Sequence, residues 1–247
     1  MPGTFSYDPP AGTVLQPGTE ALSVTFTPAD STDYTTATAS ANIDVGFTRP
    51  CITTTVNGSL KISKGESVCI RGARVNGSVA VSGGALWASG ASLHGSLSAS
   101  GAMALTLLST SVTGSVSASS TAGPVIIEGT ATTPGTLRGS VSITSGNQAV
   151  SFEHESVRGS VSITANRGGT NFSSDNVTGP VNLSGNSGGL VVNASTVLGS
   201  VSVTANTGGT AFTDNVVSGS LAIIDNSGGF EYSGNTVKGS VTNLGNT

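Results

Sequence analysis

Residues 157–164 read Val-Arg-Gly-Ser-Val-Ser-Ile-Thr, and this stretch decides the fold. Its apolar side chains fall at every second position together with Gly159, and hydroxyl or charged side chains fill the positions between them. Such alternation is typical of a half-buried β-strand with one apolar face. A cluster of turn-forming residues follows at 165–169, and we expect a second short strand around Phe172.

The stretch is one copy of a repeat, V-x-G-S-V-x-V. Its glycine recurs at Gly58, Gly77, Gly95, Gly114, Gly139, Gly159, Gly179, Gly199, Gly219 and Gly239. Every step from Gly139 onward is 20 residues, which is too short for a strand–helix–strand unit of roughly 30 residues. The repeat therefore predicts an all-β fold, a right-handed parallel β-helix over residues 48–247. About ten coils of 18–20 residues, ~4.8 Å apart, would form a rod on the order of 48 Å long.

Residues that are 20 positions apart should stack in columns inside such a helix. One column holds aromatic side chains, and another holds asparagines just before glycine pairs, where stacked amides can hydrogen-bond to each other and to the turn backbone. The predicted columns are Phe152, Phe172, Val192, Phe212 and Tyr232 for the first, and Asn166, Asn186, Asn206 and Asn226 for the second.

The composition excludes several classes of protein. Nine Lys and Arg against 13 Asp and Glu give a formal net charge of -4, whereas a nucleic-acid-binding protein would show a basic excess. No apolar run approaches the length of a membrane span, and the two cysteines lack metal-site spacing. We therefore predict no metal, no cofactor, no nucleic-acid partner and no membrane span. The Ser- and Thr-rich, charge-poor surface favours an extracellular or cell-surface location.

Residues 1–47 do not follow the repeat. They contain short stretches of alternating apolar and polar residues at 2–7, 11–15, 22–28 and 33–39, separated by Pro and Gly. Their motifs P-G-T-F-x-Y, A-G-T-V-L, L-S-V-T-F-T-P and D-Y-T-T-A-T-A resemble the C-terminal half of bacterial immunoglobulin-like repeats. The resemblance implies a partial β-sandwich unit in this segment. Its preceding strands are absent, so we expect it to be mobile, packed on the first coils or completed by another chain.

The repeat region resembles the secreted β-helix segments of actinobacterial surface proteins, which have the same recurring G-S-V and N-x-G-G motifs. That resemblance implies an exported, non-enzymatic, structural or adhesin-like module that serves as a rigid stalk. We expect its partners to be surface glycans or further copies of itself. Because no cap is evident after Val237, end-to-end assembly into filaments is a second structural interpretation.

Cys51 and Cys69 lie about one coil apart, a spacing that suits a disulfide. Counting back from Val56 and Val75, however, aligns Cys51 with Ile70, so a bridge would need a local bulge. A disulfide and two buried free thiols both remain open.

The densest titratable group is Glu153, His154, Glu155, Arg158 and Asp175. The carboxyls of Glu155 and Asp175 share a column and could approach ~5 Å, a separation used in retaining glycoside hydrolysis. This is the basis for an alternative function as a carbohydrate-active enzyme. A solvated edge is the other interpretation, because the column continues as serine and asparagine.

A further alternative is binding of ice or a carbohydrate lattice by the outward face of the first strand of each coil. Three coils there carry a regular hydroxyl array: Ser140, Ser142 and Thr144; Ser160, Ser162 and Thr164; Ser200, Ser202 and Thr204. The irregular residues 128–136 account for one 25-residue step and should form a loop that bulges from the rod.

Overall fold

The computed structural model describes residues 2–11, 13, 15 and 18–247. The chain divides into two compact units, Met1–Thr48 and Arg49–Thr247. The described residues form strands and turns throughout, and no helix among them is long and apolar enough to cross a membrane.

The first unit is one antiparallel sheet in the order β1 (Gly3–Asp8), β2 (Gly18–Pro28) and β3 (Ala37–Val45). The strand expected at residues 11–15 falls partly outside the described residues, and Ala11, Thr13 and Leu15 are not in a strand. The strand expected at 33–39 begins only at Ala37, because a turn occupies residues 31–33 and residues 34–36 are irregular.

This sheet has one apolar face and one hydroxyl face. Phe5 lies opposite Phe26, with ring centroids 5.0 Å apart, and Tyr7 lies opposite Val24 on the same face. Phe5 and Tyr7 are 63% and 60% exposed, so this face has no second layer among the described residues of the unit. The unit is therefore a single sheet, and the predicted sandwich character stays a prediction.

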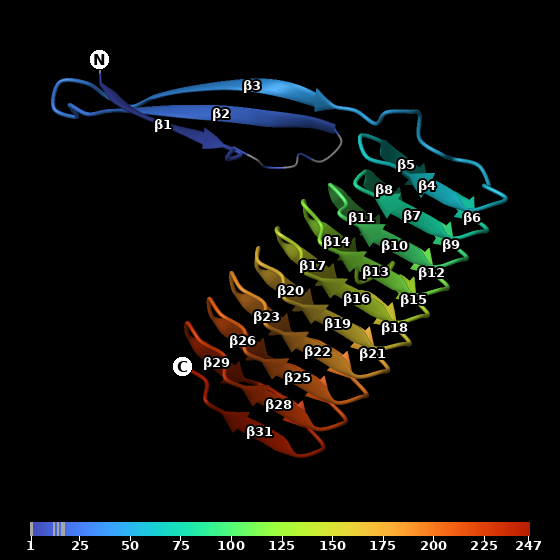
Figure 1. Ribbon diagram of the computed structural model, residues 1–247. Coiled ribbons are helices and arrows are strands. Elements are labelled where there is room, and N and C mark those ends of the chain that lie inside the picture. Colours follow the sequence, from blue (N-terminus) through green and yellow to red (C-terminus); the bar gives the residue numbers. More distant parts are fainter. Residues whose placement is uncertain (1, 12, 14, 16–17) are drawn as a thin grey trace. The chain divides into compact units, whose positions relative to one another are not determined.

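The second unit is a stack of coils, each of which contributes one strand to each of three parallel sheets (Figure 1). The first sheet contains β4 (Leu60–Ile62), β7 (Val79–Ser82), β10 (Leu97–Ser100), β13 (Val116–Ser119), β16 (Val141–Thr144), β19 (Val161–Thr164), β22 (Val181–Ser184), β25 (Val201–Thr204), β28 (Leu221–Ile224) and β31 (Val241–Leu244). The second sheet contains β5 (Ser67–Arg71), β8 (Ala85–Ser89), β11 (Ala104–Leu108), β14 (Val125–Glu128), β17 (Val150–Glu153), β20 (Thr170–Ser173), β23 (Leu190–Asn193), β26 (Thr210–Thr213) and β29 (Phe230–Ser233). The third sheet contains β6 (Arg74–Val75), β9 (Ser92–Leu93), β12 (Ser111–Val112), β15 (Gly135–Leu137), β18 (Glu155–Val157), β21 (Asn176–Val177), β24 (Thr196–Val197), β27 (Val216–Val217) and β30 (Thr236–Val237).

The predicted parallel β-helix is confirmed. The second and third sheets have nine strands each and the first has ten, so the described residues form nine complete coils and one further strand rather than about ten. Ten strands at ~4.8 Å give the first sheet a length of roughly 43 Å.

The prediction of one continuous strand over residues 157–164 is wrong. β18 ends at Val157, and β19 begins at Val161, so the chain turns a corner between two sheets. Gly159 makes this corner possible, because a Cβ there would lie only 2.6 Å from the carbonyl carbon of Gly139 in the coil before it. The alternation continues across the corner, since both Val157 and Val161 are buried.

The interior is filled by columns of stacked side chains. Phe152 pairs with Phe172, Phe172 with Val192, Val192 with Phe212 and Phe212 with Tyr232. The Phe152 and Phe172 rings stack in parallel with centroids 5.5 Å apart, and both are fully buried. Tyr232 belongs to the same column but is 38% exposed, since no further described coil covers it.

Candidate functional site

An interior ladder of amides joins the coils at the corner between the first and second sheets. We call Asn166, Asn186, Asn206 and Asn226 the asparagine ladder; all four are buried. The Nδ2 group of Asn186 donates to Asn206 Oδ1 over 3.1 Å and to the Ile163 carbonyl over 2.9 Å, and Asn206 Oδ1 also accepts from the Asn186 backbone N–H. The other members repeat this geometry, ending on Asn246.

A second interior column runs along the corner between the second and third sheets. It consists of Glu155, Asp175, Ser195, Asn215 and Asn235, and we call it the acid column. Its first four members are at most 2% exposed. The interpretation of Glu155 and Asp175 as a solvated edge is therefore wrong.

The reason is the local backbone. The residue just before each member adopts a left-handed conformation, with φ of 54° at His154 and 59° at Ser174. This turn directs the next side chain inward. From Asp175 onward, the side-chain oxygen accepts the backbone N–H of the coil before it, as Asp175 Oδ1 does from Glu155 N over 2.8 Å. One feature of the sequence could have predicted this inward position. Glu155 and Asp175 lie at multiples of 20 residues from Asn215, and an asparagine at a coil corner is typical of an interior amide like those of the asparagine ladder.

The two carboxyls of the acid column are buried without full hydrogen bonding. Glu155 Oε2 and Asp175 Oδ2 have no partner among the described residues. Burial raises the pKa of Glu155 to about 8, and the charge of Glu128 acts in the same direction. Burial also raises the pKa of Asp175 well above its ordinary value; the Glu155 backbone N–H opposes that shift, and the charges of Glu155 and Glu153 add to it.

The bulging loop lies beside these carboxyls. Register places Glu128 opposite Glu153 and Gly135 opposite Glu155, so the insertion that lengthens this coil is residues 130–134. A pocket of about 270 Å³ lies between this loop and the neighbouring coils, and its lining includes Thr130, Pro134, His154, Glu155, Ser156 and Asn176. Glu155 is thus the one member of the carboxyl pair that borders this pocket.

This arrangement gives little support to glycoside hydrolysis. A retaining glycosidase places both carboxyls on the substrate, with one of them ionised. Here Asp175 is 2% exposed and hydrogen-bonded to the backbone, and Glu153 is engaged by Ser151 and Asn171. Arg158 lies at the next corner and, within the described part of the chain, makes no ion pair with either carboxyl.

The predicted hydroxyl array lies on the outward face of the first sheet. We call this surface the serine face: the columns of Ser142, Ser162 and Ser202, of Thr144, Thr164 and Thr204, and of the preceding Ser140, Ser160 and Ser200. Asn182 and Ser184 continue the first two of these columns between the coils of Ser162 and Ser202. Pro180 interrupts the column that precedes the strands.

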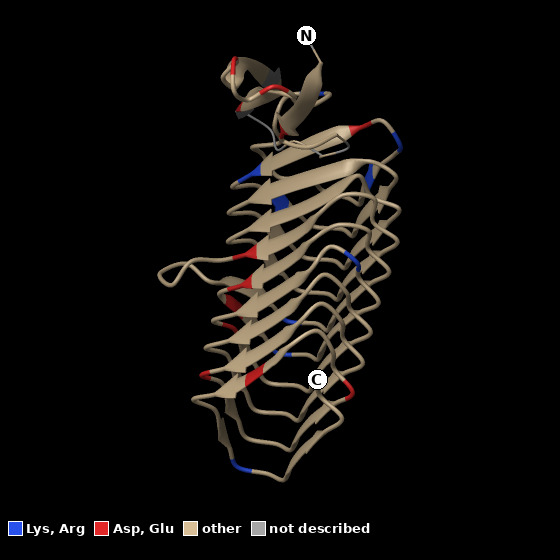
Figure 2. Cartoon of the chain, turned by 90° about the vertical axis from the view of Figure 1, so that its left-hand side faces the viewer, with Lys and Arg blue, Asp and Glu red and all other residues tan. Residues whose placement is uncertain are grey.

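Two pairs of hydroxyls on the serine face are hydrogen-bonded to each other. Ser160 Oγ donates to Ser140 Oγ over 3.1 Å, and Thr164 Oγ1 donates to Thr144 Oγ1 over 3.3 Å. Ser142 is exposed, whereas Ser162 is half-buried. The strands that carry these columns, β16, β19, β22 and β25, contain no charged residue. Figure 2, in which the second sheet faces the viewer, shows only scattered charged residues along that neighbouring sheet.

A disulfide joins Cys51 and Cys69, with Cα atoms 4.5 Å apart. Ile52 pairs with Ile70 and places the cysteines in register, so the one-residue irregularity that a bridge requires lies after them. The next bridge, Val56 to Val75, spans one residue more, so the turn between the bridges absorbs the difference.

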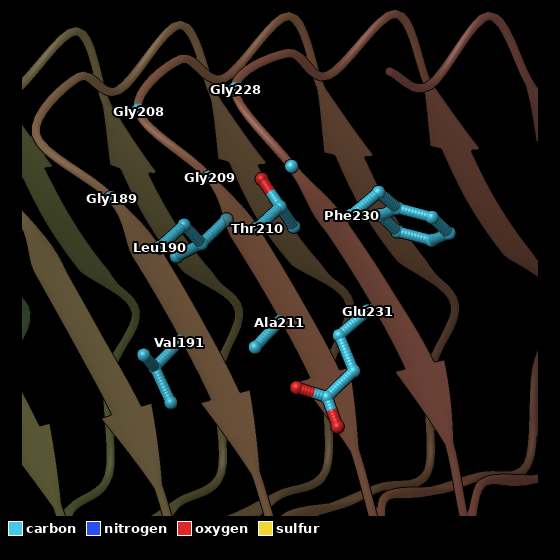
Figure 3. Close-up of a pocket in the computed structure, with 11 residues that line it drawn as sticks. Gly189, Leu190, Val191, Gly208, Gly209, Thr210, Ala211, Gly228, Phe230 and Glu231 are labelled. Atoms are coloured by element: carbon cyan, nitrogen blue, oxygen red, sulfur yellow. The ribbon is translucent and has the colours of Figure 1, made fainter.

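A shallow hollow of about 390 Å³ lies on the second sheet in the last coils (Figure 3). Stacked glycine pairs such as Gly208 and Gly209 form one side, and Ala211 and Glu231 line the floor. The glycines are required by the stacking itself, since a Cβ on Gly208 would lie 2.8 Å from the backbone nitrogen of Gly189. The hollow is thus a by-product of close coil packing.

Comparisons with protein-family models, with curated proteins and with solved structures found no match to this chain. Its own geometry is therefore the basis for assigning a function.

Proposed function

We propose that this protein is a non-enzymatic structural module of a bacterial secreted or cell-surface protein, with residues 49–247 acting as a rigid stalk. The observation that carries this proposal is the continuous interior. Aromatic and aliphatic columns, the asparagine ladder and the acid column each run through successive coils, so each coil is fixed by its neighbours.

The disulfide supports the location. Disulfides persist in oxidising compartments such as the cell exterior and are rare in the cytosol. Cys51 and Cys69 close the first turn of the β-helix and tie Ile52 to Ile70, which protects an end of the stack from fraying.

The amphipathic sheet of residues 1–48 supports the second part of the proposal. We propose that this sheet is half of an immunoglobulin-like sandwich. Phe5, Tyr7, Val24 and Phe26 form the apolar layer that such a half would present to a second sheet.

Digestion of the full chain with a non-specific protease, followed by mass spectrometry, tests the stalk. We expect cleavage within residues 1–48 and in the loop 130–134, while the coils on either side stay intact for hours. Cleavage spread over many coils would contradict a rigid stalk.

An activity assay on polysaccharides tests the non-enzymatic assignment. If the wild type cleaves any polysaccharide and Glu155→Gln does not, the assignment is contradicted.

Binding to a carbohydrate or ice surface is a second candidate function, and the serine face favours it. Its hydroxyl columns stay in register over several coils. We expect a triple variant, Ser142→Lys, Ser162→Lys and Ser202→Lys, to abolish any glycan-array signal or thermal hysteresis of the wild type. The matched control, Ser156→Lys with Asn176→Lys on the third sheet, should leave the signal unchanged. A wild type without either signal would remove this candidate.

A further inference from the structure

The acid column places two carboxyls where the fold calls for amides. Further along the same column, Asn215 accepts the Ser195 backbone N–H through Oδ1 and donates from Nδ2 to the Val192 carbonyl over 2.9 Å. Asn235 repeats both roles, donating to the Phe212 carbonyl. Each amide therefore accepts through Oδ1 and donates through Nδ2, and Nδ2 donates to a carbonyl 23 residues earlier; Asn215 Nδ2 also donates to Asn235 Oδ1.

Asp175 performs only half of this role. Its Oδ1 accepts the Glu155 backbone N–H like an amide oxygen, but its Oδ2, at the place of the amide donor, has no partner among the described residues. The carbonyl 23 residues earlier belongs to Phe152. An ionised carboxylate has no proton to give that carbonyl, whereas a carboxylic acid has one.

We propose that Asp175 and Glu155 are carried as neutral carboxylic acids in the folded protein, and that their ionisation loosens this one pair of coils, making it a pH-sensitive joint in an otherwise pH-indifferent stack. The proton on Asp175 takes the place of the Nδ2 hydrogen that an asparagine of the acid column donates to a carbonyl. The proton on Glu155 removes the repulsion between two stacked carboxyls that share the interior.

The charged surroundings act in the same direction. Glu128 on β14 and Glu153 on β17 face the pair from the second sheet, and both carry like charge. His154 lies in the turn between β17 and β18. Arg138 and Arg158 follow β15 and β18 at the next corner, and in the described part of the chain neither forms an ion pair with Glu155 or Asp175.

The sign of the pH dependence follows from the raised pKa values. The folded state holds a proton on Glu155 up to a pKa of about 8, whereas the unfolded chain releases it near the ordinary pKa of 4.5. The stabilisation is therefore complete below about pH 4.5 and is lost as pH rises toward 8. Most acidic residues give the opposite trend, because their pKa values fall on folding.

The pocket beside the loop 130–134 gives the joint a route to solvent. Glu155 borders this pocket, while Asp175 lies one coil further along and does not. Glu155 is therefore the member of the pair through which protons exchange with solvent.

Hydrogen–deuterium exchange of the full chain at pH 5.5 and pH 8.5, corrected for intrinsic exchange rates, tests the proposal. We expect wild-type protection at β18 and β21 to fall by roughly tenfold or more at the higher pH, while protection at β25 changes little. Asp175→Asn should restore the amide pattern and reduce this fall, and the double variant Asp175→Asn with Glu155→Gln should abolish most of it. The control Asp214→Asn, which removes the same charge from an exposed turn residue, should behave like the wild type.

Equal protection at both pH values in the wild type would overturn the proposal, as would an undiminished fall in the double variant. If the double variant fails to fold, infrared spectroscopy of the wild type decides instead. A protonated-carboxyl band at pH 6.5 that weakens in Glu155→Gln and disappears in the double variant supports the proposal. A spectrum without such a band contradicts it.

Discussion

At the scale of single residues, the interior corners of the coils need a side chain with both an acceptor and a donor. Asparagine supplies both on a short, stiff stem, as Asn206 does for the Asn186 N–H and the Leu183 carbonyl. Glycine and serine satisfy fewer of these demands, and a carboxyl satisfies them only when it carries a proton.

Asn206→Ala should therefore be strongly destabilising. The change leaves a buried N–H and a buried carbonyl without partners and opens a cavity, and we expect a loss of about 3 kcal/mol in the free energy of unfolding. Denaturant titration measures it. Asn182→Ala on the exposed serine face is the control and should change stability by less than about 0.5 kcal/mol. Equal effects of the two variants would contradict the ladder's role.

A buried threonine offers a test in the opposite direction. Thr210 is 3% exposed, and its Oγ1 has no hydrogen-bond partner in the described part of the chain. Thr210→Val replaces this hydroxyl with a methyl group of similar shape, so we expect stabilisation by about 1 kcal/mol. Thr213→Val is the comparison, because its Oγ1 accepts from Asn193 Nδ2 and its removal should destabilise. A destabilised Thr210→Val would show that the hydroxyl is satisfied.

At the scale of the coil, the corner glycines set how closely one coil follows another. In Gly159→Ala the new Cβ would meet backbone of Gly139 at 2.6 Å, and we expect a loss of about 2 to 3 kcal/mol from the forced shift. Gly58 begins the same column, and a Cβ added there would have no described neighbour within 4 Å, so Gly58→Ala is the matched control and should be nearly neutral. Thermal unfolding of both variants checks the difference, and similar melting temperatures would contradict the steric explanation.

The constant 20-residue step made the stacking and the register predictable from sequence. Phe152 and Phe172 are 20 residues apart, like Gly139 and Gly159, and this common spacing predicts that whole coils pair in parallel. The three-sheet layout was not predictable, because the corner at residues 158–160 keeps the in–out alternation of a straight strand. The 20-residue repeat length stays the same whether the chain runs straight or turns a corner between two columns, so it does not reveal the number of sheets.

The inward position of the acid column was hidden for a different reason. A charged residue type signals a surface position, and Glu155 and Asp175 carry that signal. Only the left-handed turns at His154 and Ser174 reveal that these side chains point inward. The asparagine at position 215 of the same column held the missing information, because it matches the amides of the asparagine ladder.

At the scale of the whole β-helix, stability is close to one-dimensional, so an insertion in one coil stays local. Removing residues 130–134 joins Gly129 to Gly135 and restores the step of its neighbours. We expect the variant to fold with a stability change below about 1 kcal/mol. Deleting residues 165–169 instead should abolish folding, because that segment holds the buried Asn166. Circular dichroism with denaturant titration distinguishes the two, and an unfolded first variant would show that the loop holds its coil together.

Interior ladders that run through successive coils should make residues 49–247 one continuous stiff body. Hydrogen–deuterium exchange of the full chain at pH 6 tests this directly. We predict long-lived protection in every coil from β7 to β28, with fast exchange confined within this span to the loop 130–134 and the outer turns. A coil in the middle of the stack that exchanges as fast as the loop would contradict a single rigid rod.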